Sequence, residues 1–337
     1  MNLNPPLRIG ILGTANIARK FVAGVRPSRC VTVTAVASRE PAKARHFAEQ
    51  NAIARHFGSY ESLLADPEID ALYIPLPNSL HAEWSIRALR AGKHVLCEKP
   101  LAATAGEACA MFEAARQSKL RLAEGFPYLA QPQTLKMREL LAAGVIGQAR
   151  LIHAGMGFTL AASNNIRLDP QLAGGALMDA GVYPVSLIRI VAKQRPARVS
   201  AFAQWSGGID RSLAATLEFA DGLLAQASCS FDSAYHRQAL IAGAAGIIQT
   251  TYLNHTSAQQ PGELHLRVGS GADAQDSVIQ TPAADGFLAE AESFERLVRD
   301  GPTHWSGATP EESVDIMLIM DAILESARAG RAVALEN

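Results

Sequence analysis

The stretch Arg8–Phe21, RIGILGTANIARKF, places Gly10 and Gly13 where an apolar strand should turn into a helix. Counted from Gly13 it reads G-T-A-N-I-A, a dinucleotide fingerprint with Ala15 and Ala18 at the second and third glycine positions. Small residues are needed there because the turn is tight, the backbone must approach a pyrophosphate, and the helix packs on the strand. N–H groups at the helix start would then face the phosphates. The placement favours a nucleotide-binding turn over an ordinary tight strand–helix turn.

This stretch opens a series of short apolar segments, alternating with helical patterns, from Leu7 to about Phe126. Nearly continuous apolar strands that alternate with helices are typical of a parallel sheet covered on both faces. We therefore predict an α/β dinucleotide-binding domain over residues 1–126. Its expected strands are Arg8–Leu12, Val31–Ala37, Ala71–Leu76, Val95–Cys97 and Leu120–Ala123, and its expected helices are Pro41–Gln50, Asn78–Ala91 and Thr104–Gln117, with Pro41 in a first turn and Asn78 and Thr104 as N-caps.

The pattern changes after residue 126. A helical segment, QPQTLKMRELLAAG, is followed by strand-like segments joined by turn sequences such as SGG and ADG. Such a series indicates a mainly antiparallel sheet, so we predict a second domain, of the α+β class, over residues 127–337. Its expected strands are Ala149–Phe158, Arg198–Trp205, Ser212–Phe219, Leu223–Phe231, Gln238–Thr250, Glu263–Val268 and Ser277–Gln280, and its further helices are Ala176–Lys193, Phe287–Asp300 and Pro310–Ala329.

Composition narrows the class of protein. The 337 residues carry a formal charge of −1, which gives no electrostatic reason to bind nucleic acid or an anionic membrane. No apolar run approaches the roughly 20 residues that a membrane helix needs, and the N-terminus lacks a signal-peptide pattern. The cysteines, Cys30, Cys97, Cys109 and Cys229, have no metal-ligand spacing and suit a reducing compartment. We therefore expect a cytoplasmic protein without a metal site.

Two segments of the second half bear on assembly. LLAQASCSF and ALIAGAAGII carry small apolar residues on both alternating faces. Helices can cover one face of a sheet, and a second copy of the chain can cover the other. We expect a homodimer or homotetramer that assembles through the C-terminal sheet.

The end of the second expected strand bears on which dinucleotide binds. NAD-binding folds usually carry an acid about 20 residues after the glycine loop, whereas an arginine nearby accommodates the 2′-phosphate of NADP. Here Ser38 and Arg39 take that position and Lys43 follows one helical turn later, although Glu40 comes one residue late. A solvated loop is the plainer alternative. The missing acid and the two cations favour NADP, with NAD still possible.

Two further loops follow expected parallel strands, at the sheet edge where open α/β sheets bind ligands. One is IPLPNSLH and the other is CEKP. An ordinary solvated loop would explain an acid and a base after an apolar strand, but the position puts Lys99 at the edge of the expected cofactor cleft. The predicted cofactor-binding residues are Gly10, Gly13, Thr14, Ala15, Asn16, Ile17, Ser38, Arg39, Lys43, Pro75, Leu76, Asn78, His81, Glu98 and Lys99.

Six motifs run along nearly the whole chain: GILGTANIA, PLPNSLHAEW, GKHVLCEKPLA, EGFPYLAQPQ, GGALMDAGVYPV and EESVDIMLIMDAILESARAGR. In these motifs and their order the chain resembles the glucose–fructose oxidoreductase/inositol dehydrogenase (Gfo/Idh/MocA) family, and E-K-P followed by D-x-G-x-Y is the most specific part. The resemblance implies a Rossmann domain, a C-terminal domain with a large open sheet often used for dimerisation, and hydride transfer between NAD or NADP and sugars, inositols or related polyols. The Ser-Arg pair and the motif tyrosine are similar to the NADP-dependent dihydrodiol/D-xylose dehydrogenase branch.

The resemblance also implies roles for the E-K-P residues. Lys99 matches the lysine that contacts the substrate oxygen and often the nicotinamide ribose. Glu98 would hold the ammonium group in place and help to position the cofactor. Pro100 is expected to fix the turn, and in relatives the peptide bond before it is often cis, a geometry rare outside X–Pro. The alternative is that Lys99 is simply a surface lysine.

A second set of roles falls on the later motifs. Tyr183 matches the family's acid/base position; a phenol is a poor base at neutral pH, but a nearby lysine cation favours the phenolate. Asp179 precedes it by one helical turn and is expected to share its face and to orient the substrate or Lys99. Arg167 matches a position that reaches the cofactor in several relatives. The alternatives are a packed helix tyrosine and a helix-capping acid.

The catalytic set that the resemblance implies is therefore Lys99, Tyr183 and Asp179, acting on a sugar, polyol or trans-diol hydroxyl or on the matching carbonyl. Tyr183 would take the hydroxyl proton while hydride leaves to NADP, and Lys99 would stabilise the developing negative charge. A reductase of a non-sugar carbonyl and a non-catalytic NADP-binding regulator remain alternatives. The chain departs from the family pattern at Ala15 and at Gln131, where many members carry His in an H-P-Q element.

Overall fold

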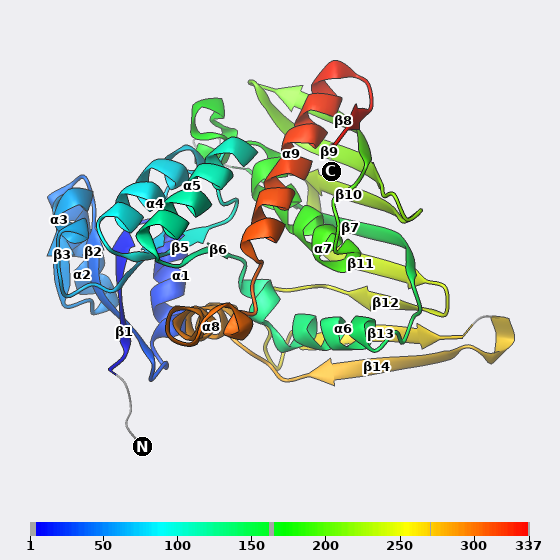
Figure 1. The fold of residues 1–337 in the computed structure, drawn as a ribbon, viewed down its shortest axis with the longest axis horizontal. Helices are drawn as coiled ribbons and strands as arrows, with labels where there is room; N and C mark the ends of the chain where they lie inside the picture. Colours follow the sequence, from blue (N-terminus) through cyan, green and yellow to red (C-terminus); the bar gives the residue numbers. More distant parts are fainter. Residues whose placement is uncertain (1–4, 162–164, 270, 336–337) are drawn as a thin grey trace. The chain divides into compact units, whose positions relative to one another are not determined.

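The computed structural model describes residues 5–161, 165–269 and 271–335. The chain divides into two compact units, one formed by Met1–Ala130 with Ala284–Pro310 and the other by Gln131–Ala283 with Glu311–Asn337. The first unit contains a parallel sheet and the second a larger, mostly antiparallel sheet, which confirms the predicted fold class (Figure 1).

The first unit is built on a six-stranded sheet in the order β3-β2-β1-β4-β5-β6, with every strand pair parallel. The order reverses between β1 and β4, and open α/β sheets bind ligands beyond the carboxyl ends of the strands at such a reversal. The strands are β1 (Leu7–Leu12), β2 (Val31–Ala37), β3 (Arg55–Phe57), β4 (Ala71–Ile74), β5 (His94–Glu98) and β6 (Leu122–Gly125). The helices are α1 (Asn16–Val25), α2 (Pro41–Asn51), α3 (Tyr60–Leu64), α4 (His81–Arg90), α5 (Ala105–Ser118) and α8 (Gly286–Asp300), with 3₁₀ turns η1 (Asn78–Leu80), η2 (Pro127–Ala130) and η7 (Pro302–His304).

The helix starts of this unit follow the sequence signals only in part. Pro41 occupies the first turn of α2, and the Thr104 side chain accepts a hydrogen bond from the Glu107 N–H at the start of α5, as predicted. Asn78 does not cap a long helix, because it lies inside the 3₁₀ turn η1 and the α-helix α4 begins only at His81. Strand β4 accordingly ends at Ile74 rather than at Leu76.

Helix α8 belongs to the first unit, although it lies far along the chain. Phe287, Ala291 and Phe294 share one buried cluster with Ile9 and Phe21. The Phe21 and Phe287 rings meet edge to face, with centroids 5.9 Å apart. This arrangement differs from the expected division at residue 126, because an amphipathic helix pattern shows which side is buried but not which sheet it is buried against.

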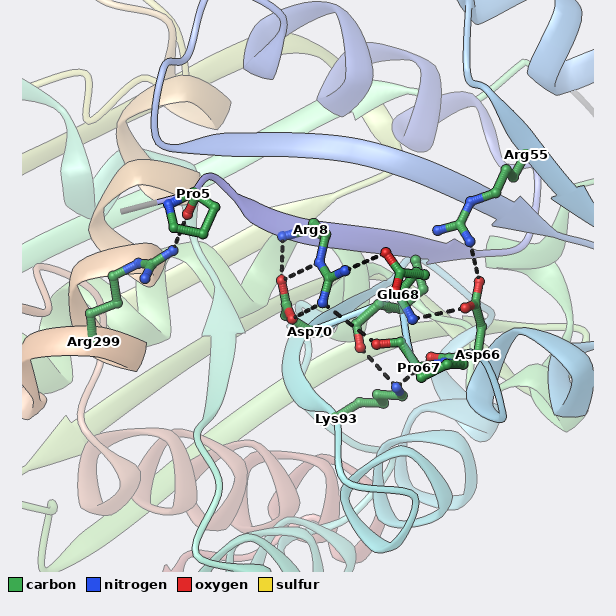
Figure 2. A network of polar contacts seen from close by, with 10 residues as sticks. Pro5, Arg8, Arg55, Asp66, Pro67, Glu68, Asp70, Lys93 and Arg299 are labelled. Atoms are coloured by element: carbon green, nitrogen blue, oxygen red, sulfur yellow. Dashed lines mark hydrogen bonds and ion pairs between the residues drawn. The ribbon is translucent and has the colours of Figure 1, made fainter. Parts of the chain in front are cut away.

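A polar network ties together the amino ends of β1 and β4, opposite the edge where a ligand is expected (Figure 2). Arg8 donates from Nε and Nη2 to the two carboxylate oxygens of Asp70, at 3.0 and 2.8 Å. Lys93 Nζ donates to the Asp66 and Ile69 carbonyls at 2.6 and 2.8 Å, and burial lowers its pKa. Bidentate arginine–carboxylate pairs have fixed geometry, so this end of the sheet is held rigidly.

The second unit is built on a nine-stranded sheet in the order β14-β13-β12-β11-β7-β10-β9-β8-β15. Only the β7–β10 pair is parallel among the described strand pairs of this sheet. The strands are β7 (Ala149–Thr159), β8 (Arg198–Ser206), β9 (Ile209–Glu218), β10 (Leu224–Ser230), β11 (Asp232–Gly243), β12 (Gly246–Thr250), β13 (Gly262–Val268), β14 (Gln275–Thr281) and β15 (Val333–Ala334). The helical elements are α6 (Pro132–Ala142), α7 (Val182–Ala192) and α9 (Pro310–Ala329), with η3 (Ile166–Leu168), η4 (Pro170–Leu172), η6 (Gly271–Asp273) and the π-helical turn η5 (Leu177–Gly181).

One face of this sheet is covered by helices. α7 packs on β7 and β10, and α6 packs on β13 and β14. Residues of β10 alternate between buried and exposed, as expected for a sheet with one open face. The predicted single strand Gln238–Thr250 is wrong: it is two strands, β11 and β12, which pair antiparallel across a bend at Ala244 and Ala245.

The expected helix Ala176–Lys193 exists but begins with the π-helical turn η5 and becomes α-helical only at Val182. Within the described residues, the segment Pro170–Ala192 is the one helical stretch that is long and apolar enough, by length and composition, to cross a membrane. Of its most apolar window, 83% is buried inside the protein, as in the core helix of a globular domain.

Candidate functional site

The first turn of the parallel sheet has the geometry that a backbone-bound ligand needs. Gly13 has a φ of +98°, and its N–H donates to the Ala37 carbonyl at 2.8 Å. A Cβ on Gly13 would lie 3.0 Å from Cδ2 of Leu76 and 3.7 Å from the Tyr60 hydroxyl. Glycine is therefore required at this position both for its backbone conformation and for space.

Helix α1 begins directly after this turn. Its N-cap, Ala15, has φ −64° and ψ 157°, a conformation that alanine adopts readily, so the departure from glycine strains nothing. No side chain caps the helix start among the described residues. Thr14, Ala15 and Ile17 are partly exposed and Asn16 is exposed, so the N–H groups at the very start of the helix suit a phosphate.

The end of β2 presents a cation. Ser38 is buried, and its Oγ accepts a hydrogen bond from the Glu40 N–H at 3.2 Å. Arg39 is exposed and lies near the Tyr60 hydroxyl; burial raises the pKa of Tyr60, and the Arg39 charge opposes the rise. Lys43 pairs with Glu40 at 2.7 Å on the surface. The late acid Glu40 is therefore engaged by Lys43, while Arg39 lies beside Tyr60 and, through it, close to Gly13.

His81 links the two loops beyond β4 and β5. Its ring nitrogens lie 2.8 Å from the Pro100 carbonyl and 2.8 Å from the Leu76 carbonyl, and the residue is fully buried. Burial lowers its pKa, and the two carbonyls act in the opposite direction. Since both ring nitrogens contact backbone carbonyls, His81 holds together the loops that carry Leu76 and Lys99, and the cofactor contact expected of it stays a prediction. Pro75 is buried and Asn78 partly exposed in the same region.

The acid of the E-K-P element, Glu98, is buried and hydrogen-bonded. Glu98 is only 7% exposed, and its Oε1 accepts a hydrogen bond of 2.5 Å from the Tyr73 hydroxyl. The backbone N–H of Lys99 donates to the other oxygen of Glu98 at 3.3 Å. The Lys99–Pro100 peptide bond is cis, as the resemblance implied. Lys99 itself is partly exposed at the end of β5, which fits a side chain that meets a ligand better than one left on an open surface.

A further acid, Glu290 on α8, lies close enough to Glu98 for their charges to interact. It is 1% exposed, and neither carboxyl oxygen has a hydrogen-bond partner within the described residues. Burial raises the pKa of Glu290 well above its ordinary value, and the negative charge of Glu98 raises it further. Burial and the charge of Glu98 therefore both favour the protonated form of Glu290. Sequence reasoning missed it because a glutamate in an amphipathic helix pattern gives no sign of burial.

In the second unit, Asp179 is held by Arg167. The Arg167 Nε donates to Oδ2 of Asp179 at 2.6 Å. Asp179 lies within the π-helical turn η5 and Tyr183 lies in the α-helix α7 that follows it, so their expected shared face stays a prediction. The glycine of D-x-G-x-Y has a packing reason: a Cβ on Gly181 would lie 2.9 Å from Sγ of Cys229 on β10.

The turn that precedes η5 depends on Asp210, which sequence reasoning also missed. Oδ2 of Asp210 accepts a hydrogen bond from the Leu177 N–H at 2.7 Å. Burial raises the pKa of Asp210, and hydrogen bonds from the Leu177 and Ala176 N–H groups act against the rise. A Cβ on Gly175 would lie 2.2 Å from Oδ1 of Asp210, and Gly175 has a φ of +126°. The Gly-Gly sequence is thus needed to bring this acid to the start of the helix that carries Asp179.

Tyr183 has neighbours that no motif indicated. Nδ2 of Asn254 donates to the Tyr183 hydroxyl at 3.0 Å. The guanidinium carbon of Arg237 lies 4.2 Å from the centroid of the Tyr183 ring and 4.8 Å from that of Tyr252. Nη2 of Arg237 donates to Oδ1 of Asn254 at 3.1 Å. Gln131, the departure from H-P-Q, is fully buried and donates from Nε2 to the Asn254 carbonyl at 2.7 Å.

Across residues 5–161, 165–269 and 271–335, no group of three or more His, Cys, Asp or Glu side chains could hold a metal ion. All four cysteines are unpaired, and Cys109 is the exposed one among them.

Two family models match the chain. One, described as an oxidoreductase family with an NAD-binding Rossmann fold, covers residues 7–126. The other, the GFO/IDH/MocA C-terminal domain, covers residues 134–249. Together they span the turn at Gly13, the E-K-P element and the helix that carries Tyr183.

Individual proteins are similar over most of their length. A D-xylose 1-dehydrogenase (NADP(+)) of Haloferax volcanii is 36% identical and aligns over 98% of this chain and 100% of its own. A trans-1,2-dihydrobenzene-1,2-diol dehydrogenase of Danio rerio is 34% identical over 72% of this chain and 74% of its own. The structure of KijD10, a 3-ketoreductase from Actinomadura kijaniata in complex with NADP and TDP-benzene, superposes with a TM-score of 0.86 at 31% identity, covering 95% of this chain and 98% of that one.

Proposed function

The chain belongs to the GFO/IDH/MocA family of oxidoreductases, and from that premise we propose that it uses NADP to oxidise a hydroxyl group of a sugar, polyol or trans-diol, or to reduce the matching carbonyl. The observation that carries the choice of cofactor is Arg39, a cation beside the Tyr60 hydroxyl at the strand end where NAD-binding folds carry an acid. The relatives named above act on D-xylose, on a trans-dihydrodiol and on a 3-keto group, which supports this substrate class.

The cofactor would be held by the first unit. The turn at Gly13 and the uncapped start of α1 suit its pyrophosphate. Ser38 and Arg39 would meet the 2′-phosphate, with Lys43 close by in sequence. We propose that the loops of Pro75, Leu76, Asn78 and Glu98 border the nicotinamide half, and that Arg167 also serves the cofactor. When bound, the nicotinamide accepts or donates the hydride.

We propose that Tyr183 moves the proton and Lys99 stabilises charge. In the oxidative direction the substrate O–H bond breaks and its proton passes to the Tyr183 phenolate, while the C–H bond electrons leave with hydride and a carbonyl forms. The Lys99 ammonium would stabilise the negative charge that develops on the substrate oxygen. Proton transfer and charge stabilisation each contribute on the order of a few kcal/mol to lowering the barrier. Asp179, paired with Arg167, would orient the substrate.

A turnover panel of aldoses, inositols and diols, run with NADP and with NAD, tests the function. Turnover of at least one substrate with NADP is expected, and Lys99→Ala or Tyr183→Phe should lower kcat about a hundredfold or more while NADPH still binds. Lys119→Ala and Tyr235→Phe, at exposed positions, are matched controls. NADPH binding without any turnover would point instead to a regulator, and turnover of non-sugar carbonyls alone to the other reductase class.

We propose that the open face of the second sheet joins copies of the chain into a homodimer or homotetramer. Phe202 is 76% exposed and Leu224 45% exposed on its strands, and apolar exposure of this kind is typical of an interface. Light scattering at micromolar concentration should give a dimer or larger mass, and Phe202→Glu should reduce it. Four unpaired cysteines fit a reducing cytoplasm, which cell fractionation would test.

A further inference from the structure

We propose that Arg237 and Asn254 are positioning residues for proton transfer at Tyr183, and that the fixed charge of Arg237 favours the phenolate form of that tyrosine. The inference rests on the proposed acid/base role of Tyr183. All of the groups involved lie in the second unit, so the geometry below concerns that unit alone.

The position of Arg237 is fixed by its neighbours. Its guanidinium lies over two aromatic rings, those of Tyr183 and Tyr252. The Tyr252 ring cannot swing away freely, because its hydroxyl donates to the Gly155 carbonyl at 2.8 Å and the residue is fully buried. Arg237 is itself only 7% exposed. Cation–π attraction is stronger at sites removed from water, and the positive charge therefore acts on the Tyr183 ring with little screening.

The hydrogen bonds settle which way the Asn254 amide points. An arginine side chain only donates hydrogen bonds. The Asn254 side-chain atom that faces Arg237 must therefore be the amide oxygen Oδ1, which accepts the 3.1 Å hydrogen bond. The NH₂ group of Asn254 then faces the Tyr183 hydroxyl at 3.0 Å. A donor aimed at the phenol oxygen stabilises an oxyanion more than a neutral hydroxyl. Arg237 thus favours the phenolate directly, through the ring, and indirectly, by orienting Asn254.

Gln131 holds the backbone of Asn254 in place by a hydrogen bond. The Nε2 of Gln131 donates to the backbone carbonyl of Asn254, and its Oε1 accepts a hydrogen bond from Oγ1 of Thr256 at 3.3 Å. Gln133 holds the neighbouring segment, since its Oε1 accepts from the Leu253 N–H at 3.2 Å. The start of α6 therefore fixes the loop on which Asn254 lies. The glutamine at position 131 acquires a role here that the family pattern did not suggest.

Two other ionisable side chains, Asp179 and Cys229, lie on or against the helical segment that carries Tyr183. Asp179, one turn earlier, is paired with Arg167. Cys229 on β10 lies against Gly181, and burial raises the pKa of its thiol, so it stays neutral. Asn254 carries no charge. Among the contacts described above, the cation over the Tyr183 ring is Arg237.

The test compares Arg237→Met, which removes the charge but keeps length, with Arg237→Lys, which keeps the charge but loses the planar stack. In the oxidative direction, the low-pH limb of the kcat profile should move up by about one pH unit in Arg237→Met, lowering kcat about tenfold on that limb. Arg237→Lys should recover part of the loss. The KM for NADP should stay within about twofold of wild type, because the change is to proton transfer. Arg198→Met, at an exposed ion pair, is the control.

A second readout does not depend on turnover. An ultraviolet difference titration of tyrosine ionisation, with Tyr183→Phe subtracted, should show the Tyr183 signal displaced to higher pH in Arg237→Met and in Asn254→Ala. If Arg237→Met does not fold, Asn254→Ala and Arg237→Lys decide the question by the same two measurements. Profiles that superpose on wild type in folded variants would overturn the inference while leaving the role of Tyr183 intact. Full activity of Tyr183→Phe would instead overturn the proposed function.

Discussion

The hydroxyl of Tyr73 donates a 2.5 Å hydrogen bond to the carboxylate of Glu98, joining strands β4 and β5 just before Lys99. Both residues are buried, and the Tyr73 ring stacks on Phe21 with centroids 3.9 Å apart. A carboxylate removed from water is stable only when donors satisfy it. The acid of the E-K-P element is therefore anchored from a neighbouring strand, and the lysine that follows it extends from a rigid support.

Removing the Tyr73 hydroxyl should weaken both the fold and the reaction. In Tyr73→Phe the ring still stacks on Phe21, but the buried carboxylate loses a donor, which costs about 1.5–3 kcal/mol for a hydrogen bond to a charged group. Urea unfolding should show that loss, and kcat should fall because Lys99 is less well placed. Tyr235→Phe, at a side chain 62% exposed, should change neither. Unchanged stability in Tyr73→Phe would contradict the anchoring role.

Reversing the charge at Arg39 should change the choice of cofactor. In Arg39→Asp the guanidinium beside Tyr60 is replaced by the acid that NAD-binding folds carry at this strand end. The KM for NADP should rise about tenfold or more, since charge-assisted bonds to a phosphate are lost, while the KM for NAD falls or stays level. Arg45→Asp, exposed on the helix α2 that follows Arg39, controls for net charge. Equal KM changes in both variants would argue against a 2′-phosphate site.

His81 should make stability depend on pH below neutrality. Burial holds its pKa below the ordinary value of 6.5, so the unfolded chain binds a proton more readily than the folded one. The free energy of unfolding should then fall as pH drops below 6.5, by up to about 1.4 kcal/mol per pH unit for one proton. His81→Gln cannot titrate, and its stability should follow a flatter line there. His46→Gln, at an exposed position, should keep the wild-type slope.

Glu290 should produce the opposite dependence. Its pKa lies well above the ordinary value of 4.5, so the folded chain keeps a proton that the unfolded chain releases. The stability that Glu290 contributes is fully present below pH 4.5 and is lost as pH rises from there toward its folded pKa, by up to about 1.4 kcal/mol per pH unit. In Glu290→Gln that decline should vanish, so the variant gains on wild type as pH rises. The exposed Glu49→Gln serves as control, and parallel stability curves for Glu290→Gln and wild type would show that the acid is not held protonated.

The parallel sheet could be predicted because its signals are local. Continuous apolar strands, a glycine turn at Gly13 and the helix start at Pro41 all lie within a few residues of what they determine. Strand β3 was missed because three residues, Arg55 to Phe57, carry no apolar run. Helix α8 was assigned to the other domain because its partners, such as Phe21, are distant in sequence.

The surroundings of Tyr183 were less accessible to sequence reasoning, although one signal was present. Along β11, Arg237, Ala239 and Ile241 alternate on the buried side, so an arginine in register with core residues marked an unusual position. The expected strand began one residue too late to include it. The glycines on either side of Ala244 and Ala245 likewise marked the bend that divides β11 from β12. Asn254 and Gln131 meet only through tertiary structure, and no spacing rule connects them.

Strand β15, near the carboxyl end of the described residues, forms one edge of the nine-stranded sheet. β15 pairs with the first residues of β8, the Leu335 N–H donates to the Ala197 carbonyl at 3.0 Å, and Oγ of Ser326 accepts from the Ala201 N–H at 3.0 Å. Exposed edge strands can pair with strands of other chains and so cause aggregation. Strand β15 therefore covers the outer edge of β8, and a truncation that removes Val333 to Leu335 should expose that edge.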